Sequence, residues 1–147
     1  MKENKNVNDL IELLRSIDEY HIRYLKSRGL TRGSFFLLYF LRKYPDGLEP
    51  SELAGHVLIK RQLTTALLNQ FEKLNYLCRE ISKVDHRKRI VTLTKSGRNF
   101  FDQVHDDICA IDRCGLANLS EEEQKQFLLL LQRYREGILA SQIADQA

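Results

Sequence analysis

The chain is poor in the patterns that mark several large classes of protein. None of its apolar runs approaches the roughly 20 residues that a membrane-spanning helix needs. Its N-terminal stretch, MKENKNVNDLIELL, lacks the apolar centre of a secretory signal. The sequence therefore predicts a cytoplasmic protein with no membrane partner. We find no internal repeat or low-complexity segment, so 147 residues predict one domain.

Cysteine is scarce, which argues against a disulfide framework. The three cysteines, Cys78, Cys109 and Cys114, are an odd number in a chain with no secretory signal. No CxxC motif is present, and the four histidines do not pair with the cysteines at zinc spacing. The sequence predicts no metal site and favours buried structural thiols. A redox-sensing role, chiefly for Cys109 or Cys114, stays open as an alternative.

The motifs of catalysis are missing as well. The sequence has no glycine-rich phosphate loop, no metal constellation and no justified pairing of a nucleophile with a base. His86, in a strongly charged turn, fits a phosphate contact better than a catalyst. The sequence therefore predicts a protein that is not an enzyme and needs no cofactor.

Positive charge is abundant in one place only. Residues 60–98 contain ten Lys or Arg and three Asp or Glu, a net charge of +7. Residues 99–147 carry −5, and residues 1–59 carry +1. A cationic segment of this kind is typical of nucleic-acid binders. The alternative is a solvated face without a partner.

Apolar periodicity predicts a mainly α fold with a small β-hairpin. Helices are expected over 7–28, from Thr31 as N-cap to about 44, over PSELAGHV at 50–57, from about 61 to 74, from 95 to about 116, and from the Ser120–Glu123 capping box to about 143. Asn75 is expected to end the fourth of these helices. A short strand is expected before Pro50, and two longer strands over 76–82 and 90–94.

Two short helices followed by a cationic hairpin are the layout of a winged helix-turn-helix. The helix from about 61 to 74 would enter the major groove of DNA, while the hairpin tip would reach the neighbouring minor groove. Gln62 and Asn69 can each bind adenine by two hydrogen bonds, and Arg61 can bind guanine. The candidate DNA-binding residues are Ser51, Lys60, Arg61, Gln62, Thr64, Thr65, Asn69, Asp85, His86, Arg87, Lys88 and Arg89.

For three of these candidates the sequence predicts a specific position or contact. Thr64 lies at a helical spacing that also places it on the inward side with Leu67, Leu68 and Phe71. Arg87 is the residue expected to insert into the minor groove. Asp85 has two interpretations: its carboxylate orients the Arg87 guanidinium, or it caps its own turn.

The chain resembles the MarR family of bacterial transcription regulators over nearly its whole length. The resemblance is carried by Leu30-Thr31, by Ser51-Glu52-Leu53-Ala54 with Phe71-Glu72-Lys73-Leu74, and by the wing pattern D-x-R…V-x-L-T-x-x-G. The last is met by Asp85-His86-Arg87 and Val91-Thr92-Leu93-Thr94-Lys95-Ser96-Gly97. The chain has Lys60 where members often have a capping Ser or Thr. It has Leu63 at a usually polar position, so either Leu63 contacts a thymine methyl or the helix is rotated.

The resemblance implies a homodimeric repressor or activator of transcription acting at palindromic operators. A DNA-binding lobe (about 31–98) would be joined to a helical dimerisation lobe (7–28 and 99–144). Apolar stripes at 7–25 and 100–139, including Phe101 and Val104, agree with this, because they exceed what a small winged lobe can cover. The two recognition helices would then lie about 34 Å apart, one turn of DNA.

In many members a small aromatic ligand binds between the two lobes and changes the spacing of the recognition helices. The aromatic candidates for such a site are Tyr20, Tyr24, Phe35, Phe36 and Tyr39. Most aromatic residues at helical spacing belong to a core instead. For the whole chain, the alternative to DNA binding is a winged-helix module that binds only proteins.

Overall fold

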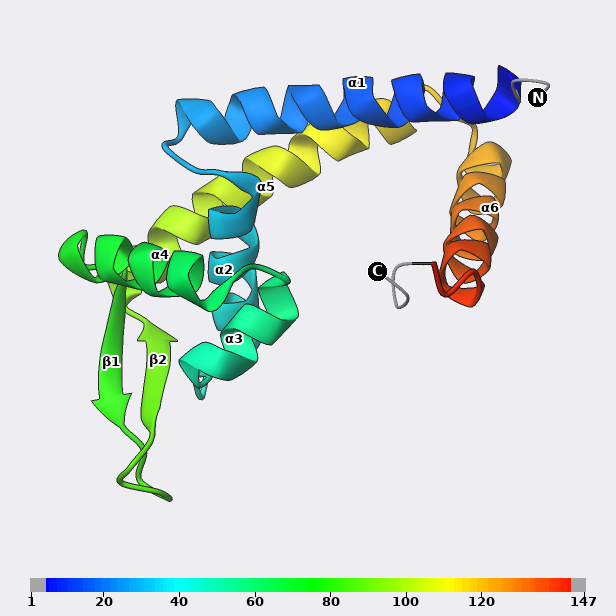
Figure 1. The fold of residues 1–147 in the computed structure, drawn as a ribbon. Coiled ribbons are helices and arrows are strands. Elements are labelled where there is room, and N and C mark those ends of the chain that lie inside the picture. The colour runs from blue at the N-terminus through cyan, green and yellow to red at the C-terminus, as the bar shows by residue number, and fades with distance from the viewer. Residues whose placement is uncertain (1–4, 144–147) are drawn as a thin grey trace. The chain divides into compact units, whose positions relative to one another are not determined.

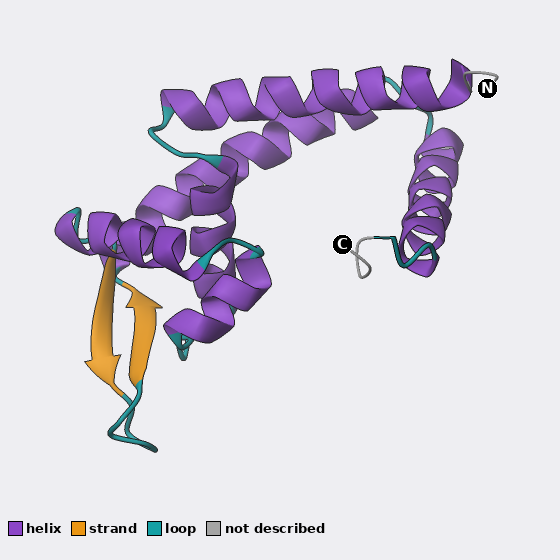
Figure 2. Cartoon of the chain, viewed as in Figure 1, coloured by secondary structure: helices purple, strands orange, loops and turns teal. Residues whose placement is uncertain are grey.

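The computed structural model describes residues 5–143 and confirms a mainly helical fold with one hairpin (Figures 1 and 2). Residue 144, the last of the predicted dimerisation lobe, lies outside the described residues. The elements in chain order are α1 (Lys5–Ser27), α2 (Arg32–Lys43), α3 (Pro50–Val57), α4 (Arg61–Lys73), β1 (Leu77–Ile81), β2 (Arg89–Leu93), α5 (Lys95–Leu116) and α6 (Glu121–Ala140).

The chain divides into two compact units. The first ends at Asp106 and the second begins at Asp107, so α5 contributes to both. The first unit holds α1 together with the winged helix-turn-helix. The predicted DNA-binding and dimerisation lobes were divided by expected role, with a boundary near residues 98 and 99, so they do not coincide with these compact units. The division into lobes stays a prediction.

Local signals set the helix ends where they were expected. Thr31 caps α2: its hydroxyl accepts a bond from the backbone N–H of Ser34 at 3.1 Å, and the Ser34 hydroxyl accepts from the Thr31 N–H at 2.7 Å. Pro50 occupies the first turn of α3. After α4, Asn75 has φ of +58°, the left-handed conformation that asparagine tolerates. The Ser120–Glu123 capping box begins α6 as predicted.

The wing is an antiparallel hairpin with one additional rung. Strands β1 and β2 pair from Leu77 with Leu93 to Ile81 with Arg89. Leu48, in the loop before α3, exchanges two backbone hydrogen bonds with Val91, at 3.1 and 2.9 Å. This single bridge is the short strand expected before Pro50. Gly47 permits it: its φ is +90°, and a Cβ there would lie 2.7 Å from the Val91 carbonyl oxygen.

The V-x-L-T-x-x-G pattern joins the hairpin to α5. The Thr94 hydroxyl donates to the carbonyl of Asn75 at 2.6 Å and accepts from the Gly97 N–H at 3.0 Å. A Cβ on Gly97 would lie 2.6 Å from the Tyr76 carbonyl carbon and closer still to its oxygen. Thr94 therefore caps the helix, and Gly97 lets the helix approach the strand.

The core of the first unit gathers side chains from α2, α3, α4, the hairpin and the start of α5. Its fully buried members include Leu37, Leu38, Leu53, Leu68, Phe71, Leu77, Val91, Phe101 and Val104. The sequence analysis assigned Phe101 and Val104 to a surface that needs a partner, which is wrong. They are 1% and 0% exposed within one chain because the first turns of α5 pack on the winged lobe.

Other apolar side chains remain uncovered. On α1 they include Val7, Ile11, Leu14, Ile17 and Tyr20, and on α6 they include Phe127, Leu128, Leu131, Tyr134 and Ile138. None of the residues of α6 is buried. Over the described residues 5–143, every helix is too short or too polar to cross a membrane.

Candidate nucleic-acid interface

Helix α4 separates an inward face from an exposed one. Thr64, Leu67, Leu68 and Phe71 are buried, and Gln62, Thr65, Ala66 and Asn69 are exposed. The division follows the helical period. Thr64 was included among the DNA-binding candidates, and this prediction is wrong. Its side chain is 2% exposed, and its hydroxyl bonds to the carbonyl of Lys60 at 3.3 Å.

The exposed face of α4 presents groups that can form hydrogen bonds with base edges. Gln62, Thr65 and Asn69 lie on it together, with Arg61 at the first position of the helix. The Thr65 hydroxyl donates to the Arg61 carbonyl at 3.0 Å. Leu63 is half exposed, beside this face.

Asn69 already has a partner on the wing. Its side-chain oxygen accepts a hydrogen bond from Nη2 of Arg79 on β1, at 2.5 Å. The Arg79 guanidinium also lies 3.6 Å from a carboxylate oxygen of Glu72. The amide oxygen of Asn69 is therefore oriented by the wing, while its two N–H donors are not engaged by this bond.

The start of α3 and the turn before α4 supply exposed polar groups. Ser51 is exposed in the first turn of α3. Lys60 is exposed at the N-cap of α4, and its side chain makes no capping bond. Leu58, between the two helices, has φ of +58° and is 89% exposed. Ser51 and Lys60 are thus available to phosphate groups, as the sequence analysis expects.

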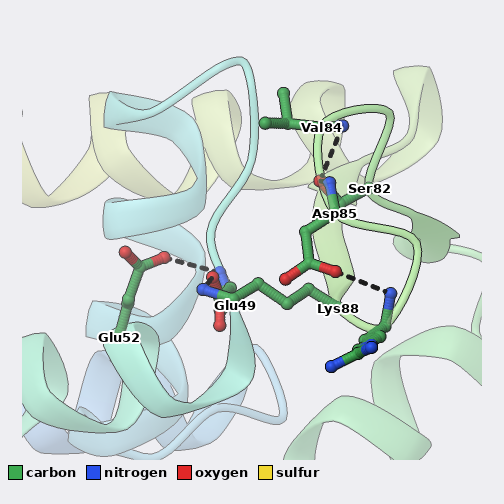
Figure 3. Close-up of polar contacts among 7 residues, drawn as sticks. Glu49, Glu52, Ser82, Val84, Asp85 and Lys88 are labelled. Atoms are coloured by element: carbon green, nitrogen blue, oxygen red, sulfur yellow. Dashed lines mark hydrogen bonds and ion pairs between the residues drawn. The ribbon is translucent and has the colours of Figure 1, made fainter.

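The wing tip is an ordered turn (Figure 3). The Ser82 N–H donates to the Lys88 carbonyl, and the Lys88 N–H donates to the Asp85 carbonyl, both at 2.9 Å. The Ser82 hydroxyl accepts from the N–H groups of Val84 and Asp85, both at 3.2 Å. Asp85 accepts from the Arg87 N–H at 3.0 Å. Of the two interpretations of Asp85, the structure therefore contains the turn cap.

Lys88 differs from the other cations of the tip because it is engaged. Its Nζ donates to a carboxylate oxygen of Glu49 at 2.5 Å (Figure 3). This hydrogen bond, and then the charge attraction of Glu49, raises the pKa of Lys88 above its ordinary value. Within residues 5–143, no carboxylate pairs with Lys83, Arg87 or Arg89, which are all exposed, as is His86.

The aromatic candidates for a ligand site fall in different places. Phe35 is 8% exposed and packs on Phe101 in the core, as the alternative of a core aromatic residue expects, and its place in a ligand site stays a prediction. Tyr20 is exposed, and Tyr24 and Tyr39 are half-buried. Phe36 faces a mostly apolar pocket of about 380 Å³ beside the helix-turn-helix, lined by Arg32, Gly33, Phe36, Phe40, His56, Val57, Leu58 and Ile59.

Two residues that contact the candidate interface were not predicted from the sequence. Arg79 contacts a residue of α4 that lies ten positions away, and Glu49 contacts a residue 39 positions away. No spacing rule links such pairs. A signal was present only for Arg79, as a cation on the strand that follows α4.

Comparisons with known proteins agree with this geometry. The chain is 30% identical over 109 residues to the HTH-type transcriptional repressor Rv2887 of Mycobacterium tuberculosis, covering 74% of this chain and 78% of that one. It is 28% identical over 109 residues to the HTH-type transcriptional regulator BilQ of Clostridium symbiosum, covering 74% and 75%. No family model matches the sequence.

Solved structures share the fold. The Staphylococcus aureus MepR–DNA complex superimposes with a TM-score of 0.73 at 19% identity, covering 92% of this chain and 99% of that one. Wild-type MarR of E. coli in its apo form superimposes with a TM-score of 0.69 at 22% identity, covering 85% and 96%. With the sequence relatives, the wing pattern and the helix-turn-helix in agreement, the chain belongs to the MarR family of winged helix-turn-helix transcription regulators.

Proposed function

We propose that the chain is a homodimeric, sequence-specific regulator that binds palindromic double-stranded DNA. The observation that carries the proposal is the exposed surface formed by α4 and the wing tip. Groups able to bond to bases (Gln62, Thr65 and Asn69) lie on a helix, and Arg87 and Arg89, which have no carboxylate partner within residues 5–143, lie on the hairpin tip. Base contacts then supply specificity, and phosphate contacts supply most of the affinity.

The uncovered apolar faces support the dimer. No residue of α6 is buried in the described part of the chain, and Leu128, Leu131, Tyr134 and Ile138 line an open apolar hollow along the helix. Exposed patches of this extent mark protein interfaces in soluble proteins. A two-fold pairing would cover them and set two recognition helices about 34 Å apart, one turn of DNA.

The salt dependence of binding tests the DNA contact. Each phosphate contact contributes about −0.9 to the slope of log affinity against log salt concentration. Because a dimer presents two copies of Arg87, the variant Arg87→Ala should lose about 1.8 from the magnitude of that slope. Lys26→Ala removes an exposed cation from the last turn of α1 and serves as the control. Equal slopes for Arg87→Ala and the unaltered protein would refute the wing contact.

Light scattering after size exclusion tests the dimer. Leu131→Asp puts a charge on the apolar face of α6 and should yield monomers. Leu58→Asp is the matched control, since Leu58 is an exposed leucine in the turn of the helix-turn-helix and should leave the dimer intact. A monomer in the unaltered protein, with no binding to random genomic fragments, would favour the protein-interaction module.

A small aromatic ligand is the third part of the proposal. The pocket beside Phe36 and Phe40 has the size of a small-molecule site and a mostly apolar lining. Arg32, on the same lining, is ion-paired with Asp18, so a ligand carboxylate would have to compete with Asp18 for it, whereas the rings suit an aromatic compound. In a thermal-shift assay, benzoate and salicylate should raise the melting temperature of the unaltered protein but not that of Phe36→Ala. The idea is refuted if neither compound shifts the melting temperature or releases bound DNA.

A further inference from the structure

One cation of the wing is tied to the helix-turn-helix. Lys88 donates to Glu49 at 2.5 Å across a separation of 39 residues, and its side chain is 50% exposed. The neighbouring cations Arg87 and Arg89 are exposed and have no carboxylate partner within residues 5–143. A lysine already bound to a carboxylate is a poor phosphate ligand, because the phosphate must first displace its partner.

The backbone around Glu49 is fixed in a position that allows this ion pair. It is the N-cap of α3, and its backbone N–H donates to the carboxylate of Glu52 at 2.8 Å (Figure 3). Its side chain is 24% exposed, less than half the value for Lys88. The preceding residue, Leu48, pairs with Val91 of β2. The carboxylate is thus held beside the hairpin by backbone structure on both sides of it.

The Lys88–Glu49 pair acts on the distal part of the hairpin, beyond Val91, where we find no other polar contact with a helix within residues 5–143. The backbone bridge from Leu48 reaches Val91, and Arg79, which contacts α4, is the cross-strand partner of Val91. Beyond that level the turn bonds join the tip only to itself. Among residues 5–143, Lys88 makes the polar contact that joins the distal hairpin to a helix. A two-stranded ribbon alone is only marginally stable.

We propose that Lys88 is a positioning residue: paired with Glu49, it sets the angle at which the wing meets DNA, and it does not itself neutralise a phosphate. The inference rests on the proposed DNA-binding function. It removes Lys88 from the predicted phosphate contacts and assigns the minor-groove and phosphate contacts of the tip to Arg87, Arg89 and His86.

Salt dependence separates positioning from phosphate contact. In the double variant Glu49→Gln/Lys88→Gln the pair is lost while the net charge is unchanged. Positioning predicts a loss of affinity of about two- to fivefold, the range for an exposed ion pair, with an unaltered salt slope. A phosphate contact from both subunits predicts a slope reduced by about 1.8. Arg87→Ala provides that reduced slope as the reference.

A charge exchange gives an independent answer. Lys88→Glu alone places two carboxylates together, and adding Glu49→Lys restores an ion pair of opposite direction. Positioning predicts that Glu49→Lys/Lys88→Glu binds DNA more tightly than Lys88→Glu. If the exchange binds no better than the single variant, or if the neutral double variant loses about 1.8 from its salt slope, the inference is overturned.

Hydrogen exchange without DNA completes the test. The Lys88–Glu49 ion pair should slow hydrogen exchange at the amide of Ser82, which donates to the Lys88 carbonyl at 2.9 Å. In the neutral double variant this amide should exchange faster, whereas in Lys83→Gln, an exposed wing lysine with no carboxylate partner in the described chain, it should not. Unchanged protection in the double variant overturns the inference. Failure of the unaltered protein to bind any duplex overturns the proposed function instead, and the inference with it.

Discussion

Gly97 offers the most direct test of how the wing is joined to α5. In an exposed helix, replacing glycine by alanine is favourable by about 1 kcal/mol, because alanine restricts the unfolded chain. At Gly97 the added Cβ would lie 2.6 Å from the carbonyl carbon and 2.8 Å from the Cα of Tyr76. Both are backbone atoms, so no side chain can turn aside. Gly97→Ala should therefore destabilise the protein.

The magnitude follows from what must move. Ordinary contact begins near 3.4 Å, so the start of α5 must withdraw from Tyr76 by at least about 0.8 Å. The withdrawal weakens two hydrogen bonds at the junction, from the Thr94 N–H to Tyr76 and from the Thr94 hydroxyl to Asn75. At about 1 kcal/mol each, together with about 1–3 kcal/mol for overpacking, the cost exceeds the gain in helix propensity. We expect a net loss of about 2–4 kcal/mol.

Urea denaturation at one fixed protein concentration measures this loss, since dimerisation would make stability depend on concentration. Gly55→Ala is the control. Gly55 lies in α3, and a Cβ there meets nothing within 4 Å. It should raise the free energy of unfolding by about 0.5–1 kcal/mol. The reasoning is refuted if Gly97→Ala is as stable as the unaltered protein, or if both substitutions change stability in the same direction.

Three further predictions concern helix ends and the core. Thr31→Ala removes the hydroxyl that caps α2 and should lower the free energy of unfolding by about 1 kcal/mol, measured in urea; no loss would contradict the observed cap. Phe35→Ala should cost about 3–5 kcal/mol in the same assay, because Phe35 is 8% exposed, whereas Phe36→Ala should cost much less, because Phe36 is 39% exposed. Hydrogen bonds from the backbone and the hydroxyl of Ser120 lower the pKa of Glu123, so its contribution to stability is present above about pH 4.3 and is lost as pH falls through the lower folded value. Melting temperatures of the unaltered protein and Glu123→Gln should therefore converge in acid; a constant difference between them would contradict this.

Helix ends were predictable because local chemistry determines them. Thr31 and the Ser120–Glu123 pair satisfy free backbone N–H groups of their own first turns, and Pro50 has no N–H at a position where the helix offers an N–H no partner. The sequence alone therefore places these starts. Asn75 likewise adopts the left-handed conformation expected of it. In each case the partners lie within a few residues, and the rule needs no knowledge of the rest of the fold.

Contacts between distant segments were not predictable in this way. Nothing in the spacing of Glu49 and Lys88 indicates that the α3 N-terminus and the wing tip meet. Asp85 shows a related difficulty: a carboxylate can accept equally from a guanidinium or from a backbone N–H two residues later. Only the backbone geometry of the turn decides between them. The burial of Phe101 depends similarly on where α5 crosses the winged lobe.

Arg79 connects the wing to Asn69, a residue proposed to contact a base. Because its guanidinium binds the side-chain oxygen of Asn69, it fixes which way the amide faces, and the N–H donors remain for the N7 of an adenine. Arg79→Ala should release the amide and relax the preference at the base that Asn69 contacts, worth about 1–3 kcal/mol, whereas Arg87→Ala should weaken binding to all sequences nearly equally. Selection of bound fragments from random DNA measures both variants. If Arg79→Ala selects the same bases with the same stringency as the unaltered protein, Asn69 does not depend on the wing for its orientation.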